Sequence, residues 1–216
     1  MTKNNFMHDI IKKTRYKIFN ISPKKIKYCI FPSKHCDYTQ LTSDRLHQHA
    51  GKDRGAFKED PLGYIRIKNS NWDFKPGIMF SKLLEYEAAL NHYTGKENWK
   101  KSKFALRNVN YIEKYKVFER GFKNSKEYLL EREKEIDKLF ISISKKGIFP
   151  IDITKNKKLF VDNISLALTK ENKLYFNNRG HHRITIAKIL GIKKIPVQIT
   201  VVKSKKNLEN FYLLNK

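Results

Sequence analysis

Hydrophobic and polar positions change their spacing in the last third of the chain, and this change predicts alternating strands and helices. Residues 164–176 alternate, turn through a short polar stretch and alternate again, which is typical of a β-hairpin. A helix over 181–190 and a strand over 195–202 follow, and Ser204 can cap a closing helix. The pattern therefore predicts a small unit in which strands and helices alternate.

Helical spacing dominates the middle of the chain. Three helices are predicted, over residues 79–92, 99–115 and 125–146. The third has the clearest boundaries, because Ser125 is a good N-cap and Gly147 follows the last turn.

Only short strands are predicted upstream, at residues 27–31 and 63–68. We therefore expect an α+β protein. Residues 1–120 would form a mainly helical N-terminal region of unknown role, and residues 121–216 would form a small α/β module.

The charge of the chain indicates which kinds of partner it can bind. There are 46 Lys and Arg residues against 21 Asp and Glu residues, a formal net charge of +25. Such a surface attracts polyanions, including nucleic acid and nucleotides. The alternative is that lysine serves here only as a solubilising residue.

The cysteines and the apolar segments suggest where the protein works. Two cysteines are too few for a disulfide scaffold, and no apolar run is long enough for a membrane span or a signal peptide. We expect a cytoplasmic protein. A metal site is not predicted, because the set Cys29, His35, Cys36, His47 and His49 lacks the usual zinc spacing.

The candidate chemistry gathers at the start of the helix predicted over 181–190. Gly180 precedes it and lets the backbone approach a ligand closely. A helix N-terminus presents backbone N–H groups and a partial positive charge, and Arg183 adds a guanidinium that matches phosphate oxygens. His181 and His182 can donate to phosphate. The pattern indicates an anion site, although a solvated helix start would have the same residues.

Two segments carry a resemblance to a known superfamily. Residues 139–151 (LFISISKKGIFPI) place a Ser-Ile pair ahead of Gly-hydrophobe-x-Pro and a strand. Residues 178–197 (NRGHHRITIAKILGIKKIPV) contain Gly-x-x-Arg, then Ala, Leu-Gly and Ile-Pro-Val. In this order and with this gap, the segments resemble the two boxes of the ParB/sulfiredoxin-like superfamily. The likeness covers about residues 131–203.

The resemblance implies a compact α/β module that binds nucleotide phosphate at Gly180, His181, His182 and Arg183. Members of the superfamily include CTP-dependent partition clamps, ATP-using sulfiredoxins, free-serine kinases and proteins described as nucleases. It thus implies ATP or CTP with Mg²⁺ as cofactors, and it leaves the reaction open.

The chain departs from the superfamily at several points, and these departures reduce the number of expected functions. His181 stands where sulfiredoxins have a cysteine, so sulfinic-acid repair is not expected. The chain ends at Lys216, where partition proteins continue into a DNA-reading domain, so a partition role is not expected either. Arg179 stands where the serine-kinase group has an Asp, which adds positive charge.

A reaction at this turn needs a base or a metal ligand. Asp152 is the first candidate, because by analogy its strand lies beside the phosphate turn, and His182 is the candidate acid or base. Asp162 and Glu171 are the other acids nearest in sequence. For each carboxylate the alternative is a surface charge or a loop cap.

Three functions are consistent with these residues. The first is a nucleotide-dependent enzyme, a phosphotransferase or an ATPase, that uses the Gly180–Arg183 turn and Mg²⁺. The second is a non-catalytic DNA- or RNA-binding protein that uses its basic surface. The third is a ParB-like nuclease that depends on Asp152.

Overall fold

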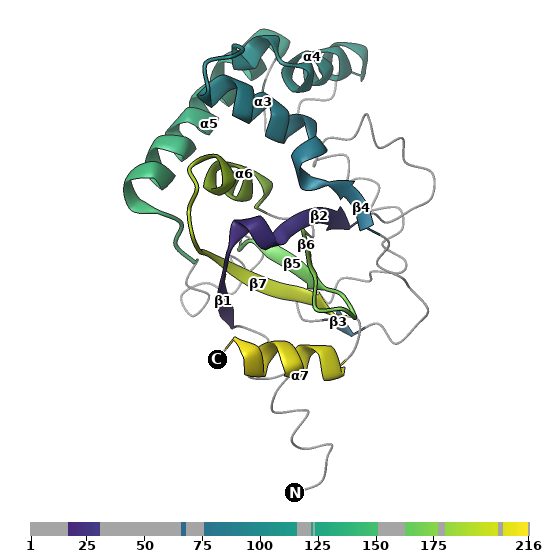
Figure 1. The fold of residues 1–216 in the computed structure, drawn as a ribbon. Coiled ribbons are helices and arrows are strands. Elements are labelled where there is room, and N and C mark those ends of the chain that lie inside the picture. Colours follow the sequence, from purple (N-terminus) through teal and green to yellow (C-terminus); the bar gives the residue numbers. More distant parts are fainter. Residues whose placement is uncertain are drawn as a thin grey trace, which may run out of the picture.

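The fold combines one mixed β-sheet with a helical unit (Figure 1). The computed structural model describes residues 17–30, 66–67, 76–115, 122, 124–150, 163–176, 180–202 and 205–215. The strands are β1 (Ile18–Ile21), β2 (Ile26–Ile30), β3 (Arg66–Ile67), β4 (Pro76–Met79), β5 (Ser165–Leu168), β6 (Leu174–Phe176) and β7 (Ile195–Val202). The α-helices are α3 (Leu84–Tyr93), α4 (Lys103–Tyr115), α5 (Ser125–Lys146), α6 (His181–Ile189) and α7 (Lys205–Leu214). Short 3-10 turns are η1 (Pro23–Lys25), η4 (Phe80–Lys82) and η5 (Trp99–Lys101).

The sheet has the strand order β1-β7-β5-β6-β2-β4, and β3 pairs with the far end of β7. β5 and β6 form the predicted antiparallel hairpin, with Leu166 opposite Phe176. Crossover connections place β7 parallel to β5, and β2 parallel to β6. The mixed sheet confirms the α+β class at this level.

The sheet joins the two predicted regions of the chain. β1 and β2 come from before residue 120, yet they pair with β7 and β6, and β4 joins the sheet through β2. Strands from both sides of the boundary expected at residue 120 therefore belong to one sheet. Within its described residues, the first region contributes β1 to β4 as well as α3 and α4.

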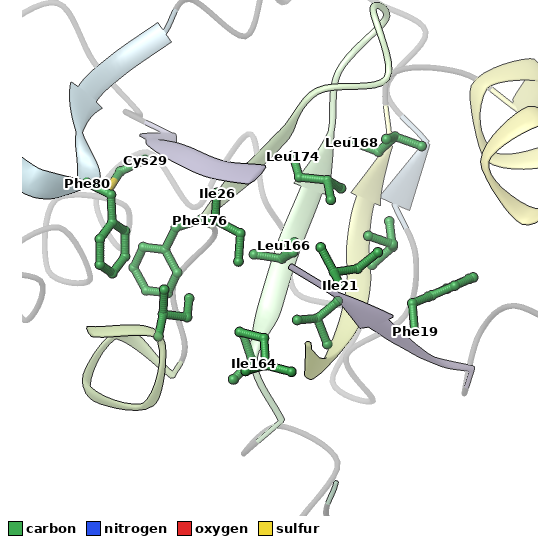
Figure 2. Close-up of a cluster of buried hydrophobic side chains, with 14 of the residues drawn as sticks. Phe19, Ile21, Ile26, Cys29, Phe80, Ile164, Leu166, Leu168, Leu174 and Phe176 are labelled. Carbon is green, nitrogen blue, oxygen red and sulfur yellow. The ribbon is translucent and has the colours of Figure 1, made fainter. Parts of the chain in front are cut away.

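The main hydrophobic core lies around the central strands, whose residues are buried throughout β5 and β6. Figure 2 shows side chains from β1, β2, β5 and β6 converging there. Phe80 packs edge-to-face on Phe176, with ring centroids 5.6 Å apart, and Phe19 contacts Phe211 of α7 at 5.1 Å. α6 and α7 lie on opposite sides of the sheet (Figure 1), which explains why the residues of its central strands are mostly buried on both faces.

A second core lies among α3, α4 and α5. Trp99, Phe104 and Tyr128 are buried there, and the Trp99 and Phe104 rings are 6.0 Å apart. α3 and α5 also contact α6, so the helical unit lies directly over that helix. Within the described part of the chain, no helix has the length and apolar character needed to cross a membrane.

Two helix starts differ from the predictions. The helix expected from residue 79 begins only at Leu84, because Met79 belongs to β4 and the chain turns through η4 to bury Phe80 and Leu83. The helix expected from residue 99 begins with η5, and Ser102 then caps α4 through its Oγ, which accepts from the Ala105 N–H at 3.2 Å.

Candidate functional site

The candidate site begins at the turn between β6 and α6. Gly180 is in the left-handed region, with φ +88° and ψ 19°, and its carbonyl accepts the first helical bond from the Ile184 N–H at 2.9 Å. A Cβ at this position would lie 2.6 Å from Ile164 Cγ1 and 3.0 Å from Ile164 Cα. Glycine is therefore required by the backbone conformation and by the contact with the residue that precedes β5.

The two histidines that open α6 have different surroundings. The His181 side chain is buried, and its ring centroid lies 6.4 Å from Phe176 and 3.8 Å from His182. His182 is half-buried. His181 thus faces the interior, and His182 lies nearer the surface of the turn.

Arg132 on α5 brings a second guanidinium to this turn. It is buried, its Nη2 contacts Nε2 of His182, and its Nη1 donates to Oε2 of Glu135 at 2.6 Å. A guanidinium only donates hydrogen bonds, so Nε2 of His182 is the acceptor. The His182 proton then resides on Nδ1, and the contact fixes both the tautomer and the orientation of the ring.

The first turn of α6 carries positive charge without an acidic residue of its own. Arg183 is a half-buried residue of this turn, and it follows the N-cap residue Gly180 in the first turn of the helix. α5 provides the contrast, because Asn124 caps it and Glu127 sits in its first turn. Two arginines, Arg183 of this turn and Arg132 in contact with it from α5, therefore accompany the N-terminus of α6, with Glu135 as an exposed counter-charge to Arg132.

A second polar group lies farther along α6. Burial raises the pKa of the Cys29 thiol on β2, the Glu85 carboxylate raises it further, and Lys188 opposes both. Burial also lowers the pKa of Lys188, whose Nζ lies 5.5 Å from the centroid of the Phe80 ring. Glu85 on α3 is buried as well. The group links β2, α3 and α6 and leaves Cys29 as a protonated, unreactive thiol at neutral pH.

The structure brings Gly180, His181, His182 and Arg183 together, as their sequence adjacency required. The two candidate acids Asp152 and Asp162 lie outside the described residues. Glu171 is exposed in the turn before β6, whereas Gly180 follows β6, so this carboxylate lies at the opposite end of the strand. Hydrogen bonds from its own backbone and from Thr169 lower its pKa, as expected for a loop cap.

Other sequence candidates are placed only in part. Of the cysteine and histidine set, Cys29 is buried in the core, and the remaining members are outside the described ranges. No group of three or more His, Cys, Asp or Glu side chains in the described part of the chain is placed to hold a metal ion.

Arg132 is the site residue that sequence reasoning missed. It belongs to the buried stripe of α5, between Tyr128 and Ile136 at intervals of four residues. A charged residue within an otherwise apolar stripe was the available signal, because a buried guanidinium needs a partner. Comparisons with protein-family models, curated proteins and solved structures found no match to this chain.

Proposed function

We propose that the N-terminal turn of α6 binds the phosphate groups of a nucleotide, and that the sheet with α5 and α6 forms a ParB/sulfiredoxin-like module around it. One observation carries the proposal. A turn that only glycine can form opens a helix whose first turn has no acid, and guanidinium groups of α5 and α6 accompany it.

Each group has a proposed role in binding. Backbone N–H groups of the first turn and the Arg183 fork would donate to phosphate oxygens. Arg132 would act as a positioning residue, because it holds His182 with Nδ1 protonated. His182 would then donate from Nδ1–H to the ligand, and it could act as a base only after Arg132 releases Nε2.

The proposed reaction is nucleotide-dependent phosphoryl transfer or ATP hydrolysis, with Asp152 as the proposed carboxylate. Mg²⁺ bound to the phosphates would neutralise part of their charge. Within the described residues, no group of three or more His, Cys, Asp or Glu side chains could hold the ion. A carboxylate base would have to come from residues beyond the phosphate turn, because the first turn of α6 contains no acidic residue.

Calorimetric titration with ATP, CTP, GTP and ADP in Mg²⁺ tests the proposal on wild type and Arg183→Ala. We expect saturable binding of one nucleotide and an affinity loss of about tenfold or more in the variant, because a charge-assisted hydrogen bond contributes about 1.5 to 3 kcal/mol. Lys138→Ala is the matched control, since it removes one positive charge from an exposed position on α5.

Two results would count against the phosphate site: no binding of any nucleotide to the wild type, or equal losses in Arg183→Ala and Lys138→Ala. The unfolding temperature of Arg183→Ala is measured beside that of the wild type, so that an affinity loss caused by damaged structure is recognised.

A further inference from the structure

Two long stretches of the chain contain no acidic residue. Residues 10–36 lie between Asp9 and Asp37 and carry eight Lys and Arg residues. Residues 172–208 lie between Glu171 and Glu209 and carry nine. These stretches are far apart in sequence, so their separation along the chain gives no reason for their charges to meet.

The sheet places the two stretches side by side. β1 pairs antiparallel with β7, and Ile21 at the end of β1 lies opposite Ile195 at the start of β7. The residues just after Ile21 therefore lie beside those just before Ile195. η1 also contacts α6, and Figure 1 shows it next to that helix, above β1.

Four exposed lysines lie on the two segments that this corner brings together: Lys24, Lys25, Lys193 and Lys194, called here the corner lysines. Among the described residues, no carboxylate pairs with any of them, whereas lysines of the helical unit do have acidic partners. Lys100 contacts Glu133 at 2.8 Å, and Lys134 contacts Glu131 at 2.7 Å. Ammonium groups gathered without counter-charges repel one another, and a bound polyanion would relieve that repulsion.

The character of the corner favours nucleic acid over a membrane. Surfaces that bind lipid combine lysine with exposed apolar side chains. Within the described chain, none of the large exposed hydrophobic residues belongs to η1 or to the connection between α6 and β7; they are Met79, Leu106, Leu130, Ile141, Phe149, Leu213 and Leu214. Lysine is a point charge that contacts phosphate without reading bases, so binding here would not depend on sequence.

We propose that the corner lysines form a surface that binds the phosphate backbone of a nucleic acid. This surface is separate from the nucleotide turn. The corner lies beyond the C-terminal end of the nine-residue α6, and the turn lies at its N-terminus, about 13 Å away along the helix axis. The proposal therefore does not rest on the proposed nucleotide function.

Fluorescence anisotropy with a labelled random-sequence duplex and its single strand, over a range of salt concentrations, tests the surface. The test variant replaces the four corner lysines with glutamine (K24Q/K25Q/K193Q/K194Q). The matched control, K96Q/K101Q/K126Q/K138Q, removes the same charge from exposed positions of the helical unit. Nucleotide binding is also measured on both variants, so that any damage to the proposed nucleotide site at the N-terminus of α6 is recognised separately.

We expect the wild type to bind nucleic acid with strong salt dependence. The corner variant should bind at least about tenfold more weakly, and its plot of log affinity against log salt should be shallower by about 3 to 4 for duplex DNA. The control should keep most of its affinity and slope. Equal losses in both variants would overturn the proposal, because net charge alone would then explain binding. No binding by the wild type, or binding to phosphatidylserine vesicles in preference to nucleic acid, would overturn it as well.

Discussion

Gly180 meets two constraints that have separate physical origins. Its positive φ is a property of the local backbone, whereas the contact with Ile164 depends on how closely α6 approaches β5. Gly191, just beyond the other end of α6, has a positive φ of +66°, but a Cβ at this position would meet open space within 4 Å. A side chain at Gly191 would therefore meet backbone strain alone, whereas a side chain at Gly180 would meet both strain and steric overlap.

Replacing each glycine with alanine measures the two effects. Gly191→Ala should lower the free energy of unfolding by about 1 kcal/mol, the cost of a left-handed alanine. Gly180→Ala should lower it by about 2 to 4 kcal/mol, because the Cβ also overlaps Ile164. Urea denaturation followed by circular dichroism gives both values. Similar losses in the two variants would show that α6 moves away from Ile164 without resistance.

The sequence predicts the site where its residues are contiguous and fails where they are distant. Gly180 to Arg183 form one turn, so their proximity follows from local structure alone. Arg132 reaches His182 from a position fifty residues away, and Glu85 approaches Cys29 from another element. Such contacts depend on how helices pack on the sheet, which hydrophobic spacing does not specify.

At the level of elements, the start of α5 was predicted almost correctly, but the residue predicted to cap it is not the one that does. Its C-terminus is as predicted, because Gly147 has φ +76° and its N–H donates to the Ile143 carbonyl at 2.8 Å. At the N-terminus Asn124 is the cap, since its Oδ1 accepts from the Glu127 N–H at 2.8 Å. Ser125 is the first helical residue, and its Oγ donates to Glu113 of α4 at 3.0 Å instead.

These contacts predict different effects for two adjacent alanine substitutions. Asn124→Ala should lower the free energy of unfolding by about 1 kcal/mol, because it leaves a first-turn N–H without its acceptor. Ser125→Ala should change it by less than about 0.5 kcal/mol, since it removes only an exposed hydrogen bond to Glu113. Chemical denaturation of the pair decides the cap. A larger loss in Ser125→Ala would return the N-cap to the residue that the sequence indicated.

Strong periodicity made the other elements predictable, whereas pairing over long distances was not. The β5–β6 hairpin and β7 follow from local alternation and turn residues. The parallel pairing of β2 with β6 joins segments about 150 residues apart, and nothing in either short strand identifies its partner. Likewise, the predicted helical pattern is interrupted at Phe80 and Leu83 because both side chains pack into the hydrophobic core of the sheet.

At the scale of the whole molecule, the core depends on both halves of the chain. Phe19, Ile21 and Ile26 come from the first strands, and they pack with side chains of β5 and β7 (Figure 2). Phe80 adds the edge-to-face contact with Phe176. The proposed likeness covers about residues 131–203, and the strands of this range, β5, β6 and β7, have further strands on both sides.

We therefore expect the fragment 121–216 to fail to fold alone. Without residues 1–120 it loses β1 and β2, so β6 and one side of β7 become open edges and the apolar residues beneath them meet water. The fragment should show poor dispersion in a ¹⁵N–¹H NMR spectrum and no cooperative unfolding, whereas the full chain should show both dispersion and cooperativity. Adding fragment 1–120 should restore part of the dispersion, because the missing strands can then pair. A well-dispersed spectrum from 121–216 by itself would establish an autonomous module and would show that β1 and β2 only extend it.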